Sequence, residues 1–301
     1  MPLVIGISAV ILIIIMTISD SVIRKIGVVS ELDNYCRADL KAYSAFNETI
    51  FSLLTSTFTP TGMQVQIPGA EFSSGQLPEK ETRTFWNLYG EPIEIEGGVH
   101  VVLQDTAGLV SPVFSSDILR RLIADAAPEY GSVFMDSLAD WQDGDEFRHL
   151  NGAERWDYRQ AGFPYGPRNS YVQCLQELSL INGMNENLFQ RVKNELIYWP
   201  AGNTNYLTMS PDLLQLILNK KDPEGELVRQ LMSLRHNHQL TPVLFSALTG
   251  IKQGEYDYFY PSGKVKLTIM AEVKTAQSHI EAVVAKRSTP TRPYTILEWR
   301  R

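Results

Sequence analysis

Cysteine is scarce in this sequence, and positive charge is outnumbered by negative charge. Only two of the 301 residues are cysteine, Cys36 and Cys174, too few for a disulfide framework and not a close pair of the kind that holds zinc. The 27 Lys and Arg face 34 Asp and Glu, and the formal net charge of −7 repels the phosphates of nucleic acid. These counts argue against cysteine chemistry as the main function and predict no nucleic-acid partner.

Common catalytic motifs are also absent. The sequence contains no G-x-S-x-G, no Walker lysine loop and no G-x-G-x-x-G. Its 44% hydrophobic and 20% charged residues are typical of a folded globular protein. We therefore expect a folded protein with no catalytic residues and no organic cofactor.

An uninterrupted apolar segment opens the chain. Residues 2–19 read PLVIGISAVILIIIMTIS, and about 18 helical residues span roughly 27 Å, close to the thickness of a bilayer core. No basic residue precedes Arg24, which disfavours a cleavable secretory signal. The segment predicts a retained single-pass membrane helix, with a long buried core helix as the alternative.

The apolar pattern continues beyond the membrane segment. Apolar residues recur at steps of three or four as far as Leu54, which predicts one helix from near Leu3 whose second half packs on a soluble domain. Gly27 is the one weak point in this helix. Arg24 and Lys25 follow the apolar segment and mildly favour a cytoplasmic body by the positive-inside rule.

The remaining chain alternates between strand-like and helix-like patterns. Residues 55–80 are typical of loops joining short extended pieces, and a helical period runs from residue 116 to about residue 248. The predicted strands are 83–88, 93–103 (interrupted at Gly97-Gly98), 264–273, 279–286 and 294–299. This order predicts an α+β fold, with an antiparallel sheet interrupted by a large α-helical insertion. The expected units are 1–55, the N-terminal helix; 56–110, the first part of the sheet domain; 111–250, the inserted helical domain; and 251–301, the C-terminal strands.

Several local strings resemble one family. They are VVLQDTAG (101–108), LADWQDGDEF (138–147), GAERWDY (152–158), ELSLINGM (177–184), TMSPDLLQLI (208–217), YFYPSGKVKLTIMAEV (258–273) and PYTILEWRR (293–301). Together they resemble the K-type minor pseudopilins of bacterial type II secretion systems, also called general secretion pathway protein K. The resemblance implies a pilin-like long N-terminal helix packed on an antiparallel β-sheet, with a large α-helical domain inserted between strands.

The resemblance also implies a function and a location. Such a chain is a non-enzymatic minor pseudopilin at the tip of the pseudopilus, which initiates pseudopilus assembly and supports protein export across the outer membrane. Its partners are the I-type and J-type minor pseudopilins, with contacts to the secretin or exoproteins, and it sits in the inner membrane with a periplasmic domain. The alternatives are a minor pilin of a type IV pilus system and a membrane-anchored periplasmic hydrolase.

Two features of the N-terminus bear on the resemblance. Family precursors carry a short basic leader ending in Gly, so we expect this chain to begin a few residues inside its precursor. Most pilin-like subunits bury a carboxylate near the helix start, where it pairs with the neighbouring subunit. Such a buried charge is costly without a partner, and this chain has no acid before Asp20, which suits a subunit with no neighbour above it.

Acidic residues are densest between positions 140 and 157. Six acids stand there against two arginines, giving a local charge of −4. Carboxylates at short spacing on a glycine-containing loop suit Ca²⁺, which takes six to eight oxygen ligands, and the family resemblance favours the same ion. A solvated acidic loop and a carboxylate-pair hydrolase are the alternatives. The expected structural Ca²⁺ ligands are Asp143, Asp145, Glu154, Glu146 and Asp140.

Overall fold

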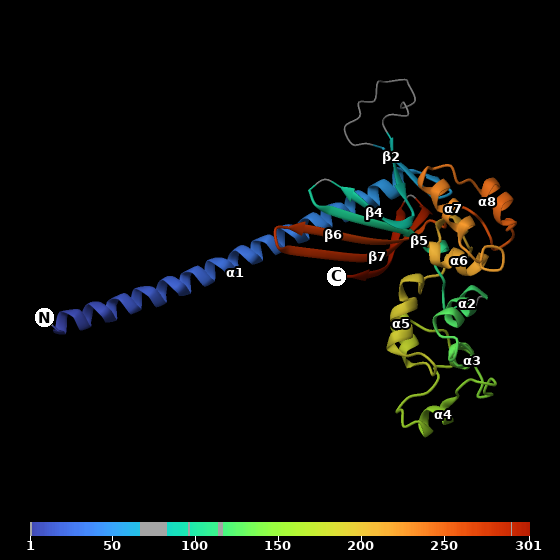
Figure 1. The fold of residues 1–301 in the computed structure, drawn as a ribbon, viewed down its shortest axis with the longest axis horizontal. Coiled ribbons are helices and arrows are strands. Elements are labelled where there is room, and N and C mark those ends of the chain that lie inside the picture. The colour runs from blue at the N-terminus through green and yellow to red at the C-terminus, as the bar shows by residue number, and fades with distance from the viewer. Residues whose placement is uncertain (1, 67–82, 96, 114–116, 290) are drawn as a thin grey trace, which may run out of the picture.

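A computed structural model describes residues 2–66, 83–95, 97–113, 117–289 and 291–301 (Figure 1). Helix α1 (Pro2–Thr55) projects from a body made of two antiparallel sheets and a group of short helices. The larger sheet has the order β4 (Tyr89–Ile95), β5 (Val99–Asp105), β6 (Lys264–Val273), β7 (Ala276–Thr289) and β8 (Arg292–Arg300). The predicted α+β class is therefore confirmed, with the helices inserted between β5 and β6. Part of the predicted loop region, residues 67–82, lies outside the described residues.

Helix α1 has two halves with different surroundings. Its most apolar window has a mean hydropathy of 2.2, and none of that window is buried. Further along, Ala38, Ala42, Ile50 and Leu53 are buried, at steps that place them on one face against β6 and β7. Gly27 does not interrupt the helix. By length and composition, the N-terminal half can cross a membrane while the C-terminal half forms part of the body.

Two of the last three residues hold β8 against α1. The ring of Trp299 lies edge-on to Phe46, with 4.9 Å between ring centroids, and 5.7 Å from Tyr43. Arg301 pairs with Asp39 and lies over the ring of Tyr43, 5.8 Å from its centroid. Trp299 and Arg301 thus form a structural contact between the final strand and the long helix.

A second, smaller sheet was not predicted from the sequence. It has the order β1 (Thr57–Thr59), β2 (Gly62–Gln66) and β3 (Arg83–Asn87), so β3 and β4 belong to different sheets although they are consecutive. The Asn87 side chain accepts from the backbone N–H of Glu91 at 3.1 Å, and Gly90 adopts φ +83°. The hydrogen bond and the positive φ bend the chain between the two strands. Glycine suits this position because it adopts a positive φ without steric strain.

The helical insertion, residues 106–263, forms the rest of the body. Its α-helices are α2 (Asp117–Ala126), α3 (Gly131–Gln142), α4 (Arg155–Gln160), α5 (Glu186–Val192), α6 (Pro211–Leu218), α7 (Glu226–His236) and α8 (Pro242–Thr249). Its 3-10 turns are η2 (Thr106–Gly108), η3 (Leu175–Leu180), η4 (Lys193–Glu195) and η5 (Tyr206–Thr208). The insertion has its own hydrophobic core, separate from the core between α1 and the sheet. Each part therefore buries its own apolar surface.

Helix starts within the insertion follow the sequence signals. Ser210 accepts from the N–H of Leu213 at 3.1 Å and Pro211 opens α6, a common combination at a helix start. Cys174 precedes η3 and makes no capping bond through its side chain. Cys174 and Cys36 are free thiols, and both are exposed.

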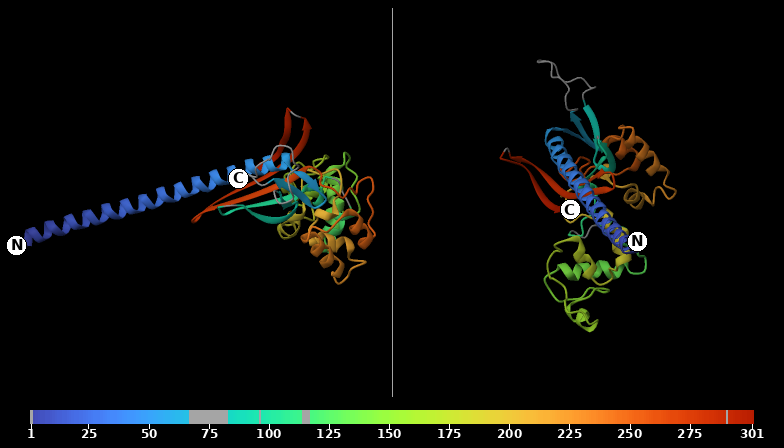
Figure 2. Two further views of the ribbon diagram at one scale, coloured as in Figure 1. Left: turned by 90° about the horizontal axis from the view of Figure 1, so that it is seen from above. Right: turned by 90° about the vertical axis from the view of Figure 1, so that its left-hand side faces the viewer.

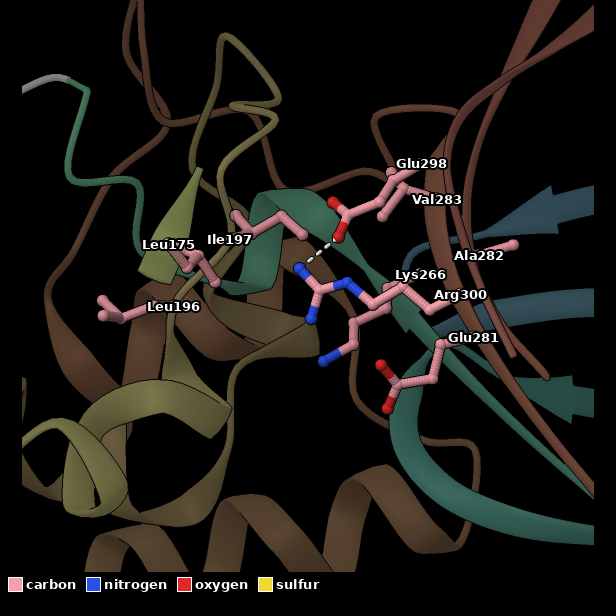
Figure 3. A pocket seen from close by; sticks show the side chains of 9 residues that line it. All are labelled: Leu175, Leu196, Ile197, Lys266, Glu281, Ala282, Val283, Glu298 and Arg300. Carbon is pink, nitrogen blue, oxygen red and sulfur yellow. Dashed lines mark ion pairs between the residues drawn. The ribbon is translucent and has the colours of Figure 1, made fainter. Parts of the chain in front are cut away.

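The insertion also touches the outer face of the sheet. Leu175, Leu196 and Ile197 line a cavity of about 40 Å³ together with residues of β6, β7 and β8, and it has room for one or two water molecules (Figure 3). In this contact, Arg300 pairs with Glu298 at 2.5 Å, and both side chains point toward the insertion. Trp299, between them in sequence, faces α1 on the other side of the sheet.

One buried carboxylate lies where the insertion leaves and rejoins the sheet. Asp105 is fully buried, and one of its oxygens accepts from the N–H and the hydroxyl of Ser262, at 3.0 and 2.7 Å. The carboxylate also accepts from Ala107 N–H at 3.3 Å, and from Asn205 and Thr208 side chains at 3.4 Å. Burial raises the pKa of Asp105, while these hydrogen bonds act in the opposite direction.

Motifs that are distant in the sequence meet at this junction. Gly108 has no room for a side chain, because a Cβ there would lie 2.5 Å from the carbonyl oxygen of Thr208. Gln104 donates to that same oxygen at 2.9 Å. Buried Arg235, on α7, donates to the carbonyl of Met209 at 2.6 Å and lies 4.1 Å from the ring centroid of Tyr89. The insertion is thus held against β4 and β5 by polar contacts.

We predict that Asp105→Ala lowers the free energy of unfolding by about 3 kcal/mol, because it leaves buried donors without an acceptor. Chemical denaturation of the full chain in detergent would measure the change. Asp125→Ala, at an exposed position of α2, is the matched control and should change stability by less than about 0.5 kcal/mol. Equal effects of the two substitutions would contradict the structural role of Asp105.

Candidate metal centre

The acidic loop, residues 140–157, lies at the end of the insertion farthest from the sheet (Figure 1). It runs from the last turn of α3 to the first turn of α4. Asp143 is the C-cap residue of α3, and Glu154 is the N-cap residue of α4. The two helix ends therefore fix the positions of two carboxylates, and the irregular segment between them supplies the others.

Three predicted ligands come together in this loop. One carboxylate oxygen from each of Asp143, Asp145 and Glu154 lies within 4.8 Å of the others. Two ligands of one Ca²⁺ ion, each 2.3–2.6 Å from it, can be up to about 5 Å apart. The spacing of these three carboxylates is therefore compatible with a shared cation.

Several oxygens of the loop have no partner among the described residues. Both carboxylate oxygens of Glu154, Oδ1 of Asp143 and Oδ2 of Asp140 are buried without a hydrogen bond. Glu154 is only 4% exposed, and burial, followed by the nearby charges of Asp140 and Asp143, raises its pKa to about 7. Burial and the neighbouring Asp145 also raise the pKa of Asp143. Unpaired buried carboxylates are costly, so these residues fit a bound cation.

A second group shares Asp143 with the first. It consists of Asp140, Asp143 and His149, whose candidate ligand atoms also lie within 4.8 Å of one another. Oδ1 of Asp140 contacts Nδ1 of His149 and accepts from its backbone N–H at 3.0 Å. The hydrogen bond to Asp140 raises the pKa of His149. Gly152 packs so closely that a Cβ there would collide with Oδ2 of Asp140.

The other acids of the loop have protein partners. Glu146 pairs with Arg155 at 3.3 Å and belongs to neither group. Asp157 accepts from Arg148 at 2.9 Å and from the backbone N–H of Glu154 at 2.9 Å, which fastens the start of α4. Of the five predicted ligands, four therefore lie in the two groups, and Glu146 stands beside them.

Sequence reasoning missed two residues of the site. His149 was missed because a lone histidine has no diagnostic spacing. Asn169, at φ +53°, donates to the carbonyl of Asp145 at 3.0 Å, while its own Oδ1 is buried without a partner. It comes from the segment after α4, so only the folded chain brings it to the loop.

The loop rests on a polar and aromatic scaffold. Trp141 donates through Nε1 to the buried carboxylate of Glu177 at 2.9 Å, and Arg168 donates to the same oxygen at 2.5 Å. Burial opposes ionisation of Glu177, but these bonds and one from the Gln173 N–H outweigh it and lower the pKa. Tyr158 is buried, with its ring 5.8 Å from that of Trp141. The DW and ELSL strings thus have a structural role at this end of the insertion.

The fold and the acidic loop define a pilin-type α+β chain carrying an inserted helical region with a candidate cation site. Within that region, residues 107–201 match the family model described as type II secretion system (T2SS), protein K. The resemblance noted from the sequence motifs is confirmed by this match over residues 107–201.

No curated protein sequence matches the chain. Among solved structures, a chain of the GspK-GspI-GspJ complex from the enterotoxigenic Escherichia coli type 2 secretion system is similar, with a TM-score of 0.49 and 15% sequence identity. The match covers 92% of this chain and 97% of that chain.

We predict that the chain without bound metal becomes less stable as the pH rises from about 4.5 to 7. Over this range the folded state keeps a proton on Glu154 that the unfolded state has lost, so raising the pH favours unfolding. The expected loss is about 1–3 kcal/mol, measured by denaturation in chelator at several pH values. Glu154→Gln should remove this part of the pH dependence, and an unchanged profile in that variant would contradict the assignment.

Proposed function

We propose that this chain is a non-catalytic minor pseudopilin that stands at the tip of a type II secretion pseudopilus, starts its assembly and so supports protein export. The observation that carries the proposal is α1, one continuous helix with an exposed apolar N-terminal half and a C-terminal half that forms part of the body. The match of residues 107–201 to protein K supports type II secretion over a type IV pilus.

The proposed location follows from the same helix. The apolar half would anchor the chain in the inner membrane by a single pass, with the body in the periplasm. We place the body there against the weak charge preference of Arg24 and Lys25, because pilin-type helices insert with the N-terminus in the cytoplasm. The acid-free start of α1 suits a tip subunit, since no neighbour above it would supply a partner for a buried carboxylate.

The proposed partners are the I-type and J-type minor pseudopilins, with the secretin or exoproteins as further contacts. On α1, after Asp20, several apolar side chains remain largely exposed. Among them are Val28, Val29 and Leu32, at 61–65% exposure. Unpaired apolar side chains at helical spacing are suited to packing against the helices of neighbouring subunits.

We further propose that the acidic loop holds structural Ca²⁺. Asp143, Asp145 and Glu154 would hold one ion, and Asp140 lies where it could hold a second cation together with Asp143. The ion would supply positive charge that offsets the repulsion among these carboxylates. It would also satisfy the oxygens of Glu154 that have no protein partner. The loop is far from the sheet, so the ion would stabilise the end of the insertion rather than the pilin-like part.

We predict that the full chain in detergent co-purifies with the I-type and J-type minor pseudopilins of the same system. Leu32→Asp should reduce the retained partners at least tenfold, because it places a charge on the exposed apolar face of α1. Glu31→Gln, at an exposed neighbouring position, is the matched control and should retain them. If the wild-type chain binds neither partner, the proposed tip complex is wrong.

We predict that Ca²⁺ raises the melting temperature of the full chain and that chelator reverses the effect. At a free concentration of about 100 times the dissociation constant, the ion contributes about 2.7 kcal/mol. Asp145→Asn should abolish most of the response, whereas Asp125→Asn, at an exposed position of α2 outside both carboxylate groups, should keep it. Identical melting temperatures with calcium and with chelator in the wild-type chain would exclude the site while leaving the pseudopilin role standing.

A further inference from the structure

Strand β8 is an open edge of the larger sheet. It pairs with β7 alone, and within the described residues no backbone hydrogen bond joins β8 to any other segment. The β7–β8 hairpin projects to one side of the body (Figure 2). An edge strand with free N–H and C=O groups is a template for another extended chain.

The face of β8 toward α1 is only partly covered. Ile296 pairs with Val284 and Tyr294 with Lys286, so both lie on the α1 side of the sheet. Their exposed fractions are 42% and 36%, whereas Val284 beside them is fully buried. The long helix covers β6 and β7 but leaves an apolar margin along β8. A further strand at this edge would bury that margin.

The hairpin is basic in an otherwise acidic protein. Arg287 and Arg292 are exposed, and among the described residues neither has an acidic partner. Arg300 and Arg301, further along, are already paired with Glu298 and Asp39. The two unpaired arginines lie near the turn between β7 and β8, so an acidic segment would meet them there.

The opposite edge of the same sheet is closed to pairing. Strand β4 contains Pro92, which has no N–H, and an irregularity between Tyr89 and Pro92 shifts its register. Two exposed acids, Glu91 and Glu94, also lie on β4. Proline, irregular register and exposed charge are common protections of an edge strand, so we do not expect a further strand beside β4.

Strand β8 also has irregular register against β7, between Val283 and Val284 and between Lys286 and Thr289. Its one proline, Pro293, is at the second residue, however, so residues 294–300 keep every backbone N–H. The part of β8 that is open to pairing, residues 294–300, therefore begins two residues after Arg292. A second copy of this chain is a poor occupant, because its own β4 is blocked by Pro92 and two copies of β8 would bring like charges together.

We propose that β8 binds an extended, acidic segment of a partner protein, which adds to the larger sheet as a further strand. Backbone hydrogen bonds along residues 294–300 would supply affinity, and Arg287 and Arg292 would select acidic side chains. Apolar residues at alternate positions of the segment would cover Ile296 and Tyr294.

The position of the hairpin disfavours a lipid surface as the occupant. Lys286, at the base of the hairpin, donates to the carbonyl of Leu53 at 3.2 Å, which places the hairpin beside the C-terminal end of α1. Between Asp20 and Leu53 the helix rises about 50 Å, at 1.5 Å per residue. The basic turn therefore lies far along α1 from the apolar segment that can enter a membrane.

The test is amide hydrogen exchange of the full chain in detergent with a synthetic ten-residue peptide of alternating Glu and Val. We expect exchange of the outward-facing amides in residues 294–300 to slow at least tenfold, with no such effect from a peptide of alternating Lys and Val. The double variant Arg287→Glu/Arg292→Glu should bind the acidic peptide about tenfold more weakly. Lys220→Glu/Lys252→Glu, at exposed positions of the insertion, is the matched control and should bind it like the wild type.

Each contrary result overturns the proposal. Absence of protection with the Glu peptide, or equal protection by the Lys peptide, shows that β8 does not select acidic strands. Protection by micelles doped with an anionic phospholipid, but not by the peptide, assigns the hairpin to lipid. Protection that grows with protein concentration alone assigns the edge to a second copy. None of these outcomes depends on whether the chain joins a pseudopilus.

Discussion

The carboxylate of Asp105 receives hydrogen bonds from residues on both sides of the junction between sheet and insertion. A buried carboxylate is tolerated only while its donors are in place, since each missing donor leaves charge without compensation. The junction is therefore cooperative: Ala107 and Ser262 must reach Asp105 together. This requirement fixes where the insertion stands on the pilin-like part, although the two parts have separate hydrophobic cores.

Buried carboxylates have different surroundings at the junction and in the acidic loop. At the junction and at Glu177, buried carboxylates are surrounded by donors. In the acidic loop, Glu154 is buried and Asp143 half-buried beside other acids, and several of their oxygens have no donor among the described residues. The scaffold of Trp141 and Tyr158 under the loop is nevertheless well packed. The free-energy cost of carboxylates without donors is thus confined to the loop. A cation bound there can offset it without rearranging the helices.

Much of the architecture could be predicted from the sequence, but the candidate site only in part. Steps of three and four residues predicted α1, and alternating segments predicted β6, β7 and β8, because burial on one face imposes these periods. The small sheet was missed, since the bend at Asn87 depends on side-chain hydrogen bonds that no hydrophobic period reports. Close-spaced carboxylates indicated the acidic loop, but Glu146 lies outside the two groups, and His149 and Asn169 join without a recognisable motif. Composition thus indicated the acidic loop, whereas which of its side chains come together follows from how α3, α4 and the next segment pack.

The placement of the insertion between β5 and β6 has a consequence for the order of folding. These neighbouring strands are separated in the chain by the whole of residues 106–263, so pairing them in an unfolded chain means closing a very long loop. The entropic cost of closure grows only slowly with length, but long-range pairing is slow. If the insertion folds first, it brings Asp105 and Ser262 together, and β5 and β6 then have only a short distance to close before they pair. We therefore expect the pairing of β5 with β6 to form after the insertion.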